Sequence, residues 1–249
     1  MARRVNYPMF GMQCKEFVMV DFQHRRTRFL KRLLLVAVVS AGVPAVMLPG
    51  TASATTATHY TFTGRWAAAS FESGEACPGH DLTFPEQITR YAGVFAFTGR
   101  IFDQNGRQSP SMLSVSVYES RFCDGTFTVT RDAFATIDLT PGQFAIPLSL
   151  GWAEVNATVP TYDSVTGQVI PVQVSLRWTA TTDPAFRPTS VEKYTFPDGS
   201  KFLFQSTGIV SRAGVARGSV SDGTRNYAVG DSYWAPLESV NDASLTITR

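Results

Sequence analysis

A strict two-residue alternation is the feature that most constrains the fold of this chain. In residues 152–160 and 169–178 apolar side chains recur at every second position, and mostly polar ones lie between them. Successive side chains of a β-strand point to opposite faces, so this period predicts strands with one buried face. Helical periodicity is not seen over any dozen residues after position 55. We therefore expect an all-β fold, a single antiparallel β-sandwich or flattened β-barrel of about nine to eleven strands.

The individual strands follow from the same pattern and from the Gly, Pro, Asp and Asn residues between runs. The predicted strands are 59–69, 91–102, 112–120, 125–131, 133–139, 143–158, 168–181, 191–196, 201–206, 209–220 and 243–248.

The clearest predicted hairpin lies around a Pro-Asp-Gly turn at residues 197–199. A type I turn with the glycine in the left-handed bulge position sets Tyr194 opposite Phe202. Tyr194, Phe196, Phe202 and Phe204 then share one face. An aromatic face of this density predicts a contribution to the core, with a ligand surface as the alternative.

A second hairpin joins the two alternating runs through a turn at residues 163–167. Matching the apolar faces of its strands leaves two registers. One sets Glu154 beside Arg177, and the other sets Trp152 beside Arg177. Either pair would lie on a solvated face and help to fix the register.

The N-terminal segment has the pattern of an export signal. Five basic residues, Arg25, Arg26, Arg28, Lys31 and Arg32, precede an apolar run that is followed by Ala52-Ser53-Ala54. The run, from Leu33 to Leu48, is shorter than the roughly 20 residues of a spanning helix. We predict a leader and secretory signal peptide at 1–54, cleavage after Ala54, a single domain at 55–249, and no membrane span after cleavage. An uncleaved membrane anchor is the alternative.

Removal of the leader changes the net charge of the protein. Eight of the 22 basic residues and two of the 20 acidic residues lie in the leader, which leaves 14 basic and 18 acidic residues. The predicted mature domain is therefore mildly acidic. Without a basic stripe to neutralise phosphates, nucleic acid is not an expected partner.

The predicted mature domain has two cysteines, Cys77 and Cys123. An even number of cysteines in an exported chain predicts a disulfide, which would stabilise the fold by roughly 4 kcal/mol through the entropy of the closed loop. Two buried thiols are the alternative. Neither cysteine has a second ligand at the spacing of a metal site, so we expect no metal there.

The sequence contains no recognisable catalytic motif and implies no cofactor. There is no nucleophile elbow, zinc-binding helix, phosphate-binding loop or dinucleotide-binding loop. The most polar cluster holds Glu72, Glu75, His80, Asp81 and Glu86. Such oxygen ligands could hold Ca²⁺, and two such carboxylates could flank a glycosidic bond. A solvated loop held by a disulfide is the simpler interpretation.

Tryptophan and tyrosine side chains provide the candidate ligand surface. We expect Trp66 and Trp178 in the core, and Trp152, Tyr233 and Trp234 on the surface. Flat exposed aromatic rings bind sugar rings by stacking, so a carbohydrate is the ligand that this surface would suit.

Two stretches of the sequence resemble a known family. The runs "NATVP…VQVSLRWTAT" and "GVARGSVSDG" are similar to uncharacterised secreted all-β proteins of actinobacterial type, over about the last hundred residues. The resemblance implies export and an all-β fold, and no activity. Gly64-Arg65-Trp66 also resembles the GxW motif of lipocalins. We interpret this motif structurally, with Trp66 closing one end of the core and Gly64 leaving room for it.

Three functions are consistent with these features. The leading hypothesis is a secreted, non-enzymatic binding or interaction protein of the extracellular space or cell envelope, with a carbohydrate or envelope component as partner. The alternative is a lipocalin-like barrel that carries a small apolar ligand. The third is a secreted carbohydrate-active hydrolase that uses Glu72, Glu75 or Asp81.

Overall fold

A computed structural model describes residues 57–79, 81, 86–103, 106, 111–195, 199 and 201–248 of the chain. All regular elements in these residues are β-strands, which confirms the expected all-β class. The strands are β1 (Ala57–Glu75), β2 (Gln87–Asp103), β3 (Ser111–Cys123), β4 (Thr126–Asp138), β5 (Phe144–Ala145), β6 (Trp152–Asp163), β7 (Gln168–Ala180), β8 (Ala185–Thr195), β9 (Lys201–Ser221) and β10 (Pro236–Thr248). Across these ranges we find no helix that could cross a membrane.

The strands form one antiparallel sheet that closes on itself. The order is β10-β1-β2-β3-β4-β6-β7-β9-β8, and β10 also pairs with β9. This second pairing completes a ring of eight strands, with β8 outside the ring and the short β5 paired to β6. The ring corresponds to the flattened barrel of the sequence-based prediction.

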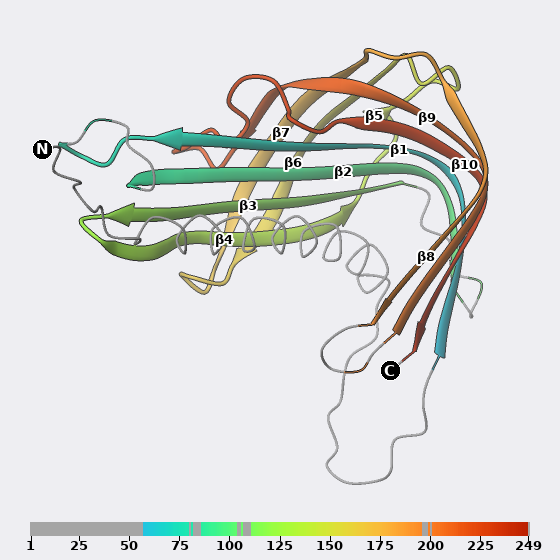
Figure 1. The fold of residues 1–249 in the computed structure, drawn as a ribbon, viewed down its shortest axis with the longest axis horizontal. Coiled ribbons are helices and arrows are strands. Elements are labelled where there is room, and N and C mark those ends of the chain that lie inside the picture. Colours follow the sequence, from blue (N-terminus) through green and yellow to red (C-terminus); the bar gives the residue numbers. More distant parts are fainter. Residues whose placement is uncertain are drawn as a thin grey trace, which may run out of the picture.

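The ring has two parts, a barrel and a projecting arm (Figure 1). The barrel contains β3, β4, β6 and β7, together with the adjoining parts of β1, β2 and β9. The arm consists of β8 paired with the first half of β9, followed by β10, the first part of β1 and the last residues of β2. In Figure 1 the arm turns away from the barrel at a sharp bend and ends with β8 and the end of β10.

Glycines allow the sheet to bend where the arm meets the barrel. Gly64 of β1 lies directly opposite Gly99 of β2. A Cβ atom on Gly64 would lie 2.4 Å from a carbonyl oxygen of β2, and one on Gly99 would lie 2.1 Å from a carbonyl oxygen of β1. Two backbones can approach this closely only where neither has a side chain. Gly64 therefore serves the close approach of two strands rather than making room for Trp66.

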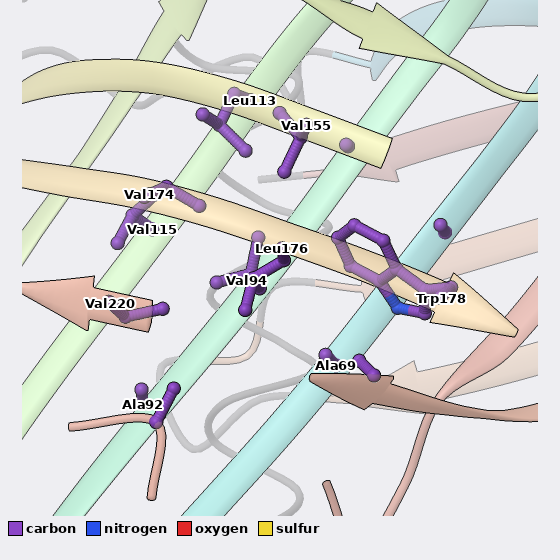
Figure 2. Close-up of a cluster of buried hydrophobic side chains, with 14 of the residues drawn as sticks. Ala69, Ala92, Val94, Leu113, Val115, Val155, Val174, Leu176, Trp178 and Val220 are labelled. Carbon is purple, nitrogen blue, oxygen red and sulfur yellow. The ribbon is translucent and has the colours of Figure 1, made fainter. Parts of the chain in front are cut away.

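A single apolar cluster forms the core of the barrel. Trp178 of β7 is fully buried, and its indole nitrogen donates a hydrogen bond to the carbonyl oxygen of Ala68 at 2.7 Å. Figure 2 shows how Val94 and Leu113 from β2 and β3 meet Leu176 and other side chains of the strands that cross them. The alternation in β6 and β7 matches this arrangement, because every second residue in them points into the cluster.

Three predicted strands are divided wrongly, and the strands predicted at 191–196 and 243–248 begin earlier in the structure, at Ala185 and Pro236. Residues 125–131 and 133–139 form the single strand β4, and residues 201–206 and 209–220 form the single strand β9. β9 continues through Gly208 because glycine takes the positive φ of 62° at that point without strain. The predicted strand 143–158 is interrupted after Ala145, where the chain turns inward and buries Ile146 and Leu150 at one end of the barrel.

The aromatic hairpin has the expected register and a different environment. Tyr194 lies opposite Phe202, with ring centroids 5.7 Å apart. Phe202 is buried and Phe204 is half-buried, but Tyr194 is 38% exposed, which corrects its assignment to the core. The reason is that, in the described part of the chain, β8 is the edge strand of the arm and pairs with β9 alone, so its side chains have neighbours on one side. Phe196 lies outside the described residues.

Trp66 also differs from the expectation of a largely buried core residue. It is half-buried, and its ring lies 6.5 Å from that of Phe95 at the bend. Its neighbours belong to the apolar cluster of the arm rather than to the barrel interior. The physical reason is that Trp66 faces away from the barrel, on the side of β1 opposite Ala67 and Ala69.

Candidate binding surface

One end of the barrel interior is charged rather than apolar. Arg90, Glu119, Arg131 and Asp163 lie on β2, β3, β4 and β6, at positions that continue the inward-facing apolar series of each strand. A buried charge is tolerated in a protein only when it is paired. How these charges are paired therefore shows whether they only close the barrel or form a reactive site.

Glu119 is the centre of the first set of contacts. Its side chain is fully buried and accepts hydrogen bonds from Arg90 at 2.8 Å and from the hydroxyl of Thr130 at 2.6 Å. The guanidinium groups of Arg225 and Arg121 lie 3.2 and 3.4 Å from its carboxylate oxygens. One carboxylate is thus surrounded by three arginines.

Arg131 is the centre of the second set. It contacts the buried carboxylate of Asp163 at 2.7 Å and that of Asp222 at 3.0 Å. Asp222 also accepts a hydrogen bond from the hydroxyl of Tyr227 at 2.9 Å, and Thr166 donates to Asp163 at 2.7 Å. These contacts join β4, β6 and the segment that follows β9.

All three buried carboxylates are held in the ionised form. Burial opposes the ionisation of Glu119, but hydrogen bonds from Thr130 and Arg90 outweigh it and lower the pKa. The pKa of Asp163 is lowered in the same way, against its burial. Burial also opposes the ionisation of Asp222, but hydrogen bonds from its own loop and from Tyr227 lower its pKa to about 2. None of these three groups exchanges a proton near neutral pH, so we interpret the network as a structural closure of the barrel end.

Residues 222–235, here called the seam segment, close the barrel between β9 and β1. The Tyr227 and Ser232 amides donate to carbonyl oxygens of β9 at 2.8 and 3.1 Å. On the other side, Ser70 of β1 donates to the Trp234 carbonyl at 2.9 Å and accepts from the Tyr233 amide at 3.1 Å. The seam segment therefore has hydrogen bonds to both strands, and its backbone is fixed.

The seam segment presents two aromatic side chains to the solvent. Tyr233 is 42% exposed and Trp234 is 38% exposed, although their backbone is hydrogen-bonded to β1. Tyr91 lies beside them, with its hydroxyl 3.2 Å from that of Ser70, and burial together with Tyr233 raises its pKa. Rigid exposed rings lose little entropy on binding, which suits a preformed binding surface.

Trp152, the third surface candidate, lies at the start of β6 and is 38% exposed. Of the two registers that the sequence allows, the structure has Glu154 opposite Arg177. Arg177 also lies over the Trp152 ring, 5.8 Å from its centroid, so it contacts both residues that the two registers proposed. Its guanidinium is 3.5 Å from the Glu154 carboxylate. Arg177 therefore covers one face of the Trp152 ring.

The acidic cluster predicted near Cys77 is not assembled into a site. Glu72 and Glu75 lie on opposite faces of β1, and Glu75 forms an ion pair with Arg90. Asp81 is exposed, and His80 lies outside the described residues. Within the described ranges we find no group of three or more residues that could hold a metal ion. Cys77 and Cys123 are within disulfide distance, with Cα atoms 5.9 Å apart.

One carboxyl group that the sequence analysis did not single out has an unusual environment. Glu238 of β10 lies opposite Trp66, and burial raises its pKa. The guanidinium of Arg187 is 3.4 Å from it and opposes this rise, whereas Glu192 adds to it. Glu238 is thus a largely buried carboxyl group with an arginine and a second carboxylate near it.

Comparison with known proteins adds little to this description. No family model matches the sequence, and no curated protein matches it. Among solved structures, the chain is similar to an acetoacetate decarboxylase-like enzyme from Sphingomonas wittichii RW1, at 10% identity and a TM-score of 0.24. The similarity covers 83% of this chain and 96% of that one, and at this TM-score it carries no argument about activity.

Proposed function

We propose that this protein is a secreted, non-enzymatic binding protein that holds a carbohydrate or another cell-envelope component through exposed aromatic side chains. The observation that carries the proposal is the seam segment, in which Tyr233 and Trp234 are exposed while their backbone is fixed on β1. Exposing two large aromatic rings on a rigid support is unfavourable for a protein without a partner. A sugar ring stacked on them would remove that exposure.

Other features agree with binding rather than catalysis or transport. The charged barrel end is locked in ion pairs, and the predicted acids Glu72, Glu75 and Asp81 are not brought together. A single apolar cluster of side chains around Trp178 forms the core of the barrel, which gives no support to a carrier of small apolar ligands. Export rests on the leader pattern of residues 1–54, which lie outside the described part of the chain.

Two experiments test this proposal. The full chain is expressed in a secreting host, and the first residue of protein from the medium is determined by mass spectrometry. We expect Thr55, whereas retention of residues 1–54 would contradict cleavage after Ala54.

The secreted protein is then incubated with insoluble peptidoglycan, chitin and cellulose, and the bound fraction is measured. The double variant Tyr233→Ala/Trp234→Ala should lose at least tenfold in affinity. The matched control is Phe186→Ala, which removes a ring that is 66% exposed on the arm. Equal binding by the two variants, or no binding by the parent protein, would contradict the proposal.

A further inference from the structure

The outer face of β6, β7 and β9 carries rows of uncharged polar side chains. Its outward side chains form cross-strand rows. One row is Asn156, Ser175 and Ser219, and the next is Thr158, Gln173 and Ser221. All six are uncharged hydroxyl or amide residues, and the four on β6 and β7 are exposed. We call these two rows the polar platform.

Charged groups occur on only one neighbouring row of this face, and each of them is paired. Arg177 lies opposite Glu154, with 3.5 Å between guanidinium and carboxylate. Arg217, directly opposite Arg177 on the other side, binds Asp231 through two contacts of 2.5 and 2.9 Å. The face therefore presents hydrogen-bonding groups and no net charge.

The platform is continuous with the aromatic side chains described above. Trp152 lies next to the charged row on β6, under the guanidinium of Arg177. Asp231, the partner of Arg217, belongs to the seam segment and is separated from Tyr233 by one residue. The polar platform therefore has aromatic rings at two of its margins.

The dimensions of the platform suit an extended ligand. Alternate residues of a strand are about 6.7 Å apart and neighbouring strands about 4.8 Å apart, so the two rows of the platform cover about 7 Å by 10 Å, and the same face continued through the charged row to Thr179 is about 20 Å long. Several sugar rings in a chain cover an area of this size. Short side chains such as those of Ser and Thr also lose little entropy when a ligand fixes them.

We infer that the polar platform is a docking surface for a neutral, extended polysaccharide. Hydroxyl and amide groups in rows match the hydroxyl groups of a neutral glycan, and a face whose charges are all paired gives no attraction for a polyanion or polycation. The inference rests on the proposed binding function and names its ligand class and its principal surface.

The test compares variants of the secreted full-length protein on defined polysaccharides. The probes are microcrystalline cellulose and chitin as neutral polymers, with polygalacturonate and chitosan as charged ones. We expect retention on cellulose or chitin that changes less than twofold between 50 mM and 1 M NaCl, because no net charge is involved. Retention only on a charged polymer, or its loss in salt, would overturn the inference.

Two platform variants locate the surface. Asn156→Ala/Gln173→Ala removes two amides from the face, and Gln173→Lys adds an unpaired charge to it. Each should weaken retention at least fivefold, whereas the matched control Thr61→Ala/Thr63→Ala changes two exposed residues on the arm and should have no effect. Circular dichroism and the melting temperature of each variant show that it is folded.

The outcomes separate the two proposals. Loss of retention in Tyr233→Ala/Trp234→Ala but not in the platform variants would overturn the platform and leave the proposed function in place. Loss in the platform variants supports the inference. Failure of the parent protein to bind any probe would overturn both.

Discussion

Replacing Asp222 by Asn is the most direct test of the charged network at the barrel end. Oδ1 of Asp222 accepts hydrogen bonds from the amides of Thr224 and Arg225, and Oδ2 accepts from Arg131 and Tyr227. An asparagine can keep the Oδ1 contacts. Its NH₂ group would point a donor at two other donors, so the pairing on the Arg131 side is lost.

The size of the effect follows from the pKa of Asp222. A fall from 3.8 to about 2 corresponds to about 2.4 kcal/mol, at 1.36 kcal/mol per pKa unit. This figure already includes the Tyr227 hydrogen bond, which is one of the causes of the shift. We therefore expect the variant to be about 2 kcal/mol less stable than the parent protein at pH 7.

The sign of the pH dependence is fixed by the direction of the pKa shift. A carboxyl group whose pKa is lowered on folding stabilises the protein fully above its unfolded value near 3.8. This contribution is lost as the pH falls through about 2. The parent protein should thus lose stability steeply between about pH 4 and pH 2, and Asp222→Asn should lose less over that interval.

The assay is urea unfolding followed by tryptophan fluorescence at a series of pH values from 7 to 2. Asp231→Asn is the control, because Asp231 also pairs with an arginine but is exposed at the surface. We expect no measurable loss of stability in this control at pH 7. The reasoning is refuted if Asp222→Asn is as stable as the control at pH 7, or if both variants have the acid dependence of the parent protein.

Three other substitutions test the rest of the fold by the same urea assay. Gly64→Ala should destabilise by more than about 2 kcal/mol, because its Cβ would meet the backbone of β2, whereas Gly151→Ala, whose Cβ has its nearest neighbour at 3.5 Å, should not. Trp178→Phe should cost about 2 to 4 kcal/mol, since it removes a buried hydrogen bond and leaves a cavity. Cys77→Ser/Cys123→Ser should cost about 2 to 4 kcal/mol, and reduction of the parent protein should cost the same amount. A cost below about 0.5 kcal/mol in any of the three would contradict the corresponding contact.

The sequence predicts the parts of this fold in which one face of a strand is buried and the other is exposed. β6 and β7 are of this kind, and their antiparallel pairing and their inward residues agree with the alternation, although β6 begins and ends later than the predicted strand 143–158. The pairing of Tyr194 with Phe202 is predicted equally well, because the Pro-Asp-Gly sequence between the two strands predicts a turn that sets this register. In these hairpins the alternation of residues and the turn sequence are sufficient to predict which strands pair.

The charged barrel end shows why other parts are not predicted. Arg131 is part of the alternating pattern of β4, and Asp163 is part of that of β6, at positions where the series would place an apolar residue. A charge at an inward position is a signal that can be read from sequence. Which charges meet is decided by the closure of the ring and by Asp222, which is 91 residues from Arg131. Only the tertiary structure provides that information.

In β1 the alternation of apolar and polar residues is interrupted, and buried charges are not the cause. In the arm, Tyr60 and Phe62 face the apolar cluster of the arm, and Trp66 continues this series. In the barrel, Ala67, Ala69 and Phe71 face the interior cluster, on the opposite side of the same strand. Between these two series apolar residues occupy consecutive positions, because the strand passes from one core to the other.

The same change of face occurs in β2, at the same level of the sheet. Phe97 belongs to the arm cluster and lies opposite Trp66, whereas Ala96 belongs to the barrel core and lies opposite Ala67. Adjacent cross-strand pairs thus belong to different cores, on opposite faces of a sheet that is not interrupted. Two neighbouring strands that lose their alternation together therefore mark the line at which a continuous sheet changes the face that it buries. In this chain that line lies next to the Gly64–Gly99 pair, so the glycines that permit the bend also allow one sheet to serve two cores.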